Sequence, residues 1–336
     1  MNLKQSLALV LCIIALPAGA VDITGAGASF PFPLYSKWAE AYKAETGVKV
    51  NYQSIGSSGG LKQIKEKTVN FAASDYPLKY EELQSEGLVQ FPAIIGGVVP
   101  IINVAGIQPG QLRLTGPVLA EIFMGQILRW DDVQIQELNP NLKFPKELIT
   151  VVHRADGSGT TAIFVDYLSK ISPSWKAKVG SGPTVKWPAV SSIGGKGNEG
   201  VTATVARIKN TIGYAEYAYV KKNNLGYTLM MNASGNYVAP SDKSFTAAST
   251  GTDWTKFPGM ATFITNALGE KAWPITAASF VLLYKNADDP AASAEVMRFF
   301  DFGFRQGQDI ARNLEYVPLP SSTFEFIRRS VWTQVQ

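Results

Sequence analysis

The sequence has almost no cysteine or histidine, and this scarcity excludes several kinds of chemistry. Among 336 residues, Cys12 is the only cysteine and His153 the only histidine. Cys12 lies in an apolar stretch near the start, so the chain after it offers neither a thiolate nor a disulfide. Metal sites need several Cys, His or carboxylate ligands close together, and no such cluster stands at ligand spacing. We therefore expect no metal and no cofactor.

Charged residues are also few, and their distribution excludes another class of partner. They make up 17% of the chain, the hydrophobic residues make up 46%, and the formal net charge is +4. This composition is typical of a globular protein, and the length is sufficient for two domains. The sequence has no basic run with interleaved aromatic residues, so we expect no nucleic-acid partner. The modest positive charge is compatible with an anionic ligand.

Long hydrophobic runs are absent except at the start, where residues 1–20 have the pattern of a signal peptide. Lys4 supplies the positive charge, Leu7 to Leu16 form the apolar region, and the small residues up to Ala20 fit a cleavage site after Ala20. The apolar region is too short to span a bilayer comfortably, although a retained N-terminal anchor is an alternative. Large residues precede Cys12, which is unlike a lipid-anchor site. The sequence thus predicts an exported protein.

The stretch from Arg154 to Thr161 predicts an anion-binding turn. It follows an apolar run, residues 148–152, that predicts a buried strand, and it precedes helical spacing over residues 162–171. Ser158 and Thr160 stand where the helix begins, beside free N–H groups that attract anions. Arg154 adds a planar fork of donors. The alternative is an ordinary capped helix in which Arg154 and Asp156 form a surface pair.

The same arrangement of strand, small-residue turn and helix start occurs twice more. Ser29 precedes a predicted helix that begins near Pro31 and ends at Gly47, and Ser57 lies in a Gly/Ser turn after a predicted strand. In an α/β sheet such turns gather at the carboxyl ends of strands, where ligands bind. Asp75 ends a further short strand, and its alternative role is that of a turn-forming residue.

Three other stretches give less definite predictions. Residues 92–104 are apolar and contain Gly96 and Gly97, so they predict either a pair of core strands or a crossing between domains. Residues 194–200 are rich in glycine and predict a mobile or ligand-adjacent loop. Residues 292–314 have helical spacing, and Gly303 within them favours an interruption.

One motif is typical of an enzyme. Gly56-Ser57-Ser58-Gly59-Gly60 matches the G-x-S-x-G turn of a serine hydrolase and stands between a predicted strand and a predicted helix. The only candidate for the general base is His153, whose neighbour Arg154 disfavours protonation of the imidazole. The sequence therefore favours a binding protein over an enzyme, and an exported hydrolase that uses Ser58 is the alternative.

Several blocks together resemble the periplasmic phosphate-binding proteins of bacterial phosphate ABC importers, over nearly the whole chain after residue 20. The blocks are Thr24–Pro31, Ile55–Gly60, Ala73–Asp75, Arg154–Thr160 and Gly194–Asn198. The resemblance implies an α/β protein with the two-lobed periplasmic-binding-protein fold of the class II type, whose lobes close like a hinge on a ligand cleft between them. Mapped onto this chain, lobe I comprises residues 21–94 plus 268–336, and lobe II comprises residues 95–267.

The resemblance also implies a site and a function. It predicts a periplasmic monomer that captures inorganic phosphate and delivers it to a membrane permease. Asp156 would hold Arg154 in place, and Ser29 stands where relatives carry threonine. His153 replaces a residue that is often arginine. A binding protein for another oxyanion is a further alternative. The implied phosphate contacts are Ser29, Phe30 through its backbone, Ser57, Asp75, Arg154, Ser158, Gly159 through its backbone, and Thr160.

Overall fold

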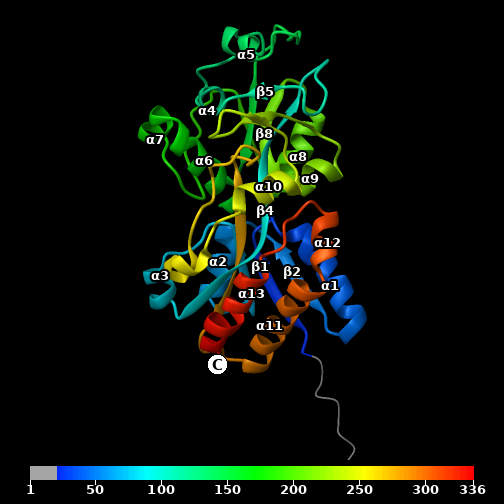
Figure 1. Ribbon diagram of the computed structural model, residues 1–336, viewed down its shortest axis with the longest axis vertical. Coiled ribbons are helices and arrows are strands. Elements are labelled where there is room, and N and C mark those ends of the chain that lie inside the picture. The colour runs from blue at the N-terminus through cyan, green and yellow to red at the C-terminus, as the bar shows by residue number, and fades with distance from the viewer. Residues whose placement is uncertain (1–20) are drawn as a thin grey trace, which may run out of the picture.

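The structure is a computed structural model that describes residues 21–336 as two lobes connected through one sheet (Figure 1). The predicted signal peptide, residues 1–20, lies outside the described residues. From residue 21 onward, no helix has the length and apolar character needed to cross a membrane.

Strands and helices alternate along much of the chain. The strands are β1 (Ile23–Gly27), β2 (Val50–Ser54), β3 (Phe71–Ser74), β4 (Leu88–Asn103), β5 (Arg113–Leu114), β6 (Thr150–Arg154), β7 (Ser192–Gly195), β8 (Thr211–Glu216), β9 (Gly226–Tyr227), β10 (Leu229–Met231), β11 (Tyr237–Val238) and β12 (Thr276–Tyr284). The helices are α1 (Phe32–Thr46), α2 (Ser57–Lys65), α3 (Tyr80–Ser85), α4 (Gly116–Phe123), α5 (Val133–Leu138), α6 (Gly159–Ile171), α7 (Pro173–Lys178), α8 (Gly197–Arg207), α9 (Tyr217–Lys222), α10 (Asp242–Ser249), α11 (Pro290–Arg305), α12 (Gln308–Asn313) and α13 (Ser321–Phe326).

The main sheet has two parallel halves joined by antiparallel strands. Its order is β2-β1-β3-β12-β4-β8-β6-β7, with β9 also paired to β4. In one half β1 is parallel to β2 and β3, and in the other β6 is parallel to β7 and β8. Helices α1, α2 and α11 lie with the first half, and α6 and α8 lie with the second (Figure 1). This arrangement confirms the predicted α/β class, and the assignment of residues 21–94 plus 268–336 and 95–267 to separate lobes stays a prediction.

The apolar stretch around Gly96 and Gly97 is one strand. β4 runs for 16 residues through the middle of the molecule, and it pairs with β12 through its first part and with β8 through its second (Figure 1). The predicted pair of core strands is therefore wrong. The alternative prediction, a crossing between domains, agrees with a single strand that pairs with β12 in its first part and with β8 in its second. A Cβ at Gly96 would lie 2.9 Å from the ring of Phe30, and one at Gly97 would lie 2.1 Å from the ring of Phe245. The two glycines thus admit aromatic rings against the strand.

Two other expectations need correction. The glycine-rich residues 194–200 do not form a separate loop, because β7 ends at Gly195 and α8 begins at Gly197. The predicted interruption lies after Gly303. α11 continues through Gly303 to Arg305. A Cβ at Gly303 would lie 2.6 Å from the nearest atom of the Trp38 indole, so glycine leaves room for this ring against the helix. The glycine that looked like a break in α11 thus serves close packing.

We predict that Gly60→Ala destabilises the first half of the sheet. A Cβ at Gly60 would lie 2.4 Å from the Cα of Gly27 and 2.6 Å from the carbonyl oxygen of Ala26, so α2 would have to move away from β1. Overpacking of this kind costs about 1–3 kcal/mol. Urea unfolding of the mature protein measures the loss.

Gly59→Ala on the same helix is the matched control. Its Cβ would meet only the side chain of Ile55, at 3.1 Å, and alanine favours a helix more than glycine does. We expect no loss of stability for this variant. Equal losses at both positions would contradict the close approach of α2 to β1.

Candidate functional site

A buried ion pair lies at the carboxyl end of β6. The side chain of Arg154 is 1% exposed, and its Nε and Nη2 donate to Oδ1 and Oδ2 of Asp156 at 2.8 and 2.5 Å. Asp156 Oδ1 also accepts from the backbone N–H of Gly197 at 3.0 Å. Burial acts to raise the pKa of Asp156, but the hydrogen bond and charge of Arg154, together with the Gly197 N–H, bring it below its usual value. The alternative of an ordinary surface pair is therefore wrong.

Helix α6 begins directly after this pair, as the sequence predicted. Ser158 caps the helix, because its Oγ accepts from the N–H of Thr161 at 3.0 Å. The Thr161 hydroxyl lies 2.7 Å from the Tyr214 hydroxyl, which also accepts from the N–H of Arg154 at 3.2 Å. Tyr214 of β8 thus links the start of α6 to the end of β6. The Ser158 hydroxyl is buried at this cap.

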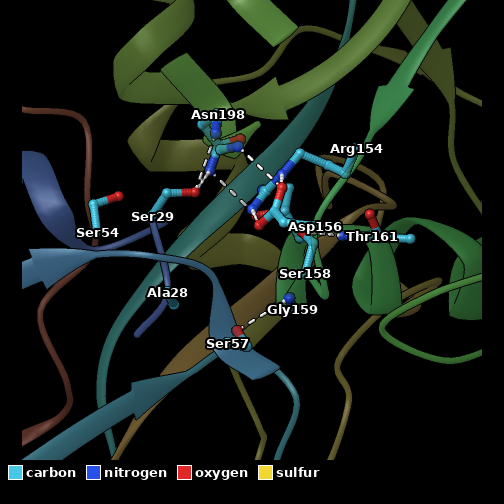
Figure 2. A network of polar contacts seen from close by, with 12 residues as sticks. Ala28, Ser29, Ser54, Ser57, Arg154, Asp156, Ser158, Gly159, Thr161 and Asn198 are labelled. Atoms are coloured by element: carbon cyan, nitrogen blue, oxygen red, sulfur yellow. Dashed lines mark hydrogen bonds and ion pairs between the residues drawn. The ribbon is translucent and has the colours of Figure 1, made fainter. Parts of the chain in front are cut away.

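Ser57, at the start of α2, connects two other predicted site residues. Its Oγ accepts from the N–H of Gly159 at 3.0 Å and from the N–H of Asp75 at 3.2 Å. A second bond runs beside it, from the N–H of Ser58 to the carbonyl oxygen of Gly157 at 3.1 Å. The start of α2 in one half of the molecule therefore meets the start of α6 in the other (Figure 2).

Asp75 follows β3 and is 1% exposed. Its Oδ1 accepts from the hydroxyl of Ser279 on β12 at 2.7 Å. Burial raises the pKa of Asp75 to about 7, although Ser279, the charge of Arg154 and the hydroxyl of Thr160 each act to lower it. A carboxyl group with this pKa can exchange a proton near neutral pH, which a simple turn-forming aspartate would not do.

Ser29 and Thr160 meet through a residue of α8. The Nδ2 group and the backbone N–H of Asn198 donate to Ser29 Oγ at 2.9 and 3.1 Å (Figure 2). Nδ2 also donates to Thr160 Oγ1 at 3.2 Å. The backbone of Phe30 is held nearby, because the Tyr316 hydroxyl donates to its carbonyl oxygen at 2.6 Å. The structure therefore brings the predicted site residues together in one buried region.

Besides Glu216 Oε1, which is an acceptor, two polar atoms in this region are buried without a hydrogen-bond partner among residues 21–336. They are Oδ2 of Asp75 and Nη1 of Arg154. One is an acceptor and the other a donor, and burying either unpaired costs free energy. A small anion that carries a proton has the groups to satisfy both: an oxygen to accept from the guanidinium and a hydroxyl to donate to the carboxylate.

Sequence reasoning assigned no role to Asn198, Ser279 or Tyr214. Asn198 stood in one of the quoted blocks, directly after the glycines of residues 194–197, so a signal was present there. Ser279 and Tyr214 lie on strands whose sequence is mostly apolar, and each side chain is buried. Only the pairing of distant strands places these hydroxyls beside Asp75 and Arg154.

The hydrolase alternative finds no geometric support. The Nδ1 of His153 lies 2.9 Å from the carbonyl oxygen of Arg154, and its ring stacks on Trp187 with the ring centroids 5.1 Å apart. Within residues 21–336, no hydrogen bond joins His153 to Ser58. The same residues hold no group of three or more His, Cys, Asp and Glu side chains that could bind a metal ion.

Comparison with known proteins gives consistent matches over most of the chain. Residues 15–305 match the model of the PBP superfamily domain. A phosphate-binding protein PstS of Haemophilus influenzae is 52% identical over 99% of this chain and 100% of its own length. A phosphate-binding protein PstS of Methanocaldococcus jannaschii is 35% identical over 86% of this chain and 79% of its own.

Solved structures share the fold at lower sequence identity. A periplasmic phosphate-binding protein (PfluDING) bound with phosphate has a TM-score of 0.75 at 20% identity and covers 92% of this chain and 94% of its own. A phosphate ABC transporter substrate-binding protein of Clostridium perfringens has a TM-score of 0.65 at 20% identity and covers 89% of this chain and 100% of its own. The chain belongs to the PBP superfamily and, within it, to the family of phosphate-binding proteins PstS.

Proposed function

We propose that the mature protein captures inorganic phosphate and delivers it to the membrane permease of a phosphate ABC importer. The observation that carries the proposal is the pair of buried, unpaired atoms, Asp75 Oδ2 and Arg154 Nη1, in one region with several hydroxyl and N–H groups. Relatives that cover nearly the whole chain are named phosphate-binding proteins, which supports the same ligand. The protein acts as a monomeric binding protein and not as an enzyme.

Transport requires the protein to lie outside the cytoplasm, in the periplasm. The signal-peptide pattern of residues 1–20 supports export, with cleavage after Ala20. One structural neighbour is described as a high-affinity periplasmic phosphate-binding protein, and another as a phosphate ABC transporter substrate-binding protein. These descriptions support the compartment and the permease as the partner.

Phosphate would be held almost entirely by donors. Arg154 offers its free Nη1, and the starts of three helices offer hydroxyls and N–H groups. The Gly159 N–H would share its hydrogen with Ser57 Oγ. Asp156 holds the guanidinium through two of its nitrogens and so orients the third. The proposed donors are Ser29, Phe30 through its backbone, Ser57, Arg154, Ser158, Gly159 through its backbone, and Thr160.

Asp75 would supply selectivity as the acceptor. Near neutral pH phosphate still carries a proton that it can donate to Asp75 Oδ2, whereas sulfate carries none. Once Asp75 is ionised, at a pH above its pKa of about 7, a sulfate oxygen would face the carboxylate lone pair to lone pair, and an unpaired buried acceptor costs roughly 1–3 kcal/mol before charge repulsion is added. The same argument disfavours other fully deprotonated oxyanions.

We predict that Asp75→Asn reduces the preference for phosphate over sulfate by roughly tenfold or more. The amide nitrogen can donate to a sulfate oxygen, so the variant no longer requires a protonated ligand. Titration calorimetry with both anions, at a pH well above the Asp75 pKa of about 7 so that the wild-type carboxyl is ionised, measures the ratio of the two affinities. Asp288→Asn removes an exposed carboxylate, paired with Lys67, and should leave that ratio unchanged. An unaltered preference in Asp75→Asn would refute the role of Asp75.

We predict that Arg154→Ala weakens phosphate binding by about a hundredfold or more. A charge-assisted contact in a buried site is lost, which amounts to several kcal/mol. The control is Arg129→Ala, because Arg129 also pairs with the carboxylate two residues later, Asp131, but is 45% exposed. Calorimetry should show an unchanged affinity for that variant. A loss under about 1 kcal/mol in Arg154→Ala would count against Arg154 as a ligand.

We also predict that the raised pKa of Asp75 makes the stability of the phosphate-free protein depend on pH. Because the folded state holds the proton up to about pH 7 and the unfolded chain releases it near pH 4, the stability from this group is present at low pH and lost as the pH rises between these values. The loss amounts to roughly 4 kcal/mol at most. Between pH 4 and 8 the free energy of unfolding of Asp75→Asn, measured with urea, should not show this part of the decrease. If the free energy of unfolding depended on pH in the same way for the wild type and for Asp75→Asn, the raised pKa of Asp75 would be contradicted.

A further inference from the structure

Asn198 lies where the two lobes meet, and its side-chain amide has only one orientation that fits its neighbours. The residue is 0% exposed. Its Oδ1 accepts from the backbone N–H of Glu216 at 3.0 Å. A backbone N–H can only donate, so the amide oxygen must face Glu216 and the amide nitrogen must face the other way. The two hydrogens of Nδ2 then go to Ser29 Oγ and Thr160 Oγ1.

These bonds decide what the Ser29 hydroxyl can do. A hydroxyl has two lone pairs and one proton. Ser29 Oγ accepts both from Nδ2 and from the backbone N–H of Asn198, at 2.9 and 3.1 Å, so both lone pairs are occupied. Its proton remains, and it can only be donated to another group. Thr160 Oγ1 likewise accepts from Asn198, so its proton is left to donate, either to the Asp75 carboxyl, whose pKa it helps to lower, or to the anion.

Ser57 shows the same arrangement with backbone groups in place of the amide. Its Oγ accepts from the N–H of Gly159 and from the N–H of Asp75, so its proton too is left to donate. A site built for an anion benefits when each hydroxyl is already turned outward as a donor, because no reorientation is needed on binding. At Thr160 this orientation depends on the Asn198 side chain, and at Ser29 it depends on that side chain together with the backbone N–H of the same residue.

From this geometry we infer that Asn198 is a positioning residue, which fixes the hydroxyls of Ser29 and Thr160 as donors to the bound anion. The inference rests on the proposed phosphate binding and deepens it. Asn198 acts through the two hydroxyls and has no need to touch the anion. Because Ser29 precedes α1 and Asn198 lies in α8, the orientation of Ser29 also depends on the contact between the two lobes. The affinity for the anion therefore depends on the contact between the two lobes.

The test compares Asn198→Ala in two backgrounds, the wild-type mature protein and the Ser29→Ala/Thr160→Val protein. Titration calorimetry with inorganic phosphate gives the dissociation constants. If Asn198 acts through the hydroxyls, its loss weakens binding roughly tenfold or more in the wild-type background, as expected for hydrogen bonds to a charged group. In the background without the hydroxyls the same change should weaken binding less than about threefold.

Thr202→Val is the matched control. The Thr202 hydroxyl donates to the carbonyl oxygen of Asn198 at 2.8 Å and is buried on the same helix, so the variant disturbs Asn198 without altering its amide. We expect its affinity for phosphate to stay within about twofold of the wild-type value. Thermal unfolding without phosphate identifies any variant that does not fold.

Asn198→Asp provides a second comparison should the alanine variant fail to fold. It keeps an oxygen for the Glu216 N–H but replaces the two donor hydrogens with an acceptor, so Ser29 and Thr160 would donate to it and turn away from the anion. The added negative charge weakens phosphate binding in both backgrounds. The additional loss of affinity in the wild-type background therefore measures the effect that passes through the two hydroxyls. That excess should again reach about threefold or more.

Losses of equal size in both backgrounds would overturn the role of Asn198 while leaving phosphate binding intact. A wild-type protein that does not bind phosphate would instead overturn the proposed function, and this inference with it.

Discussion

The hydrogen bonds that join the starts of α2 and α6 are the contacts on which the site depends. Ser57 Oγ accepts from Gly159 and Asp75, and the N–H of Ser58 donates to Gly157. Gly56, with φ +87°, permits this approach, because a Cβ there would lie 2.3 Å from a carboxylate oxygen of Asp156. Two helix starts from separate halves of the sheet thus come into contact, with their N–H groups and dipoles gathered in one buried region.

Charge within the site is nearly balanced before any ligand enters. Arg154 is paired with Asp156, and Asp75 lies close enough for the charge of Arg154 to act on its pKa. Attraction for an anion therefore has to come largely from oriented N–H and O–H dipoles, which are strong in a buried, water-poor region. Asp75 opposes a fully deprotonated anion, so the arrangement that binds an anion also discriminates between protonated and fully deprotonated anions.

The long strand β4 gives this site its support. It pairs with β12 through one part and with β8 through another, and both strands carry polar groups to the site: Ser279 to Asp75, and Tyr214 to Arg154. Gly96 and Gly97 let Phe30 and Phe245 pack against the strand. The position of Phe30, next to Ser29, is therefore fixed by the strand that crosses between the lobes.

Local sequence was sufficient for the helix starts of the site and for some of the strands and helices around them. Helix α1 begins after Pro31 and ends at Thr46, directly before Gly47, and Ser158 caps α6, because proline, glycine and serine act on the backbone within a few residues. Resemblance to a family added Asp75 to the predicted site. Asn198 was not assigned although it ends one of the blocks that carry the resemblance, and Ser279 and Tyr214 were not assigned because nothing near them in the chain shows what they face. Their roles come from strand pairing and from the contact between lobes, which no local pattern encodes: Tyr214 and Arg154 are 60 positions apart, Asn198 and Ser29 are 169 apart, and Ser279 and Asp75 are 204 apart.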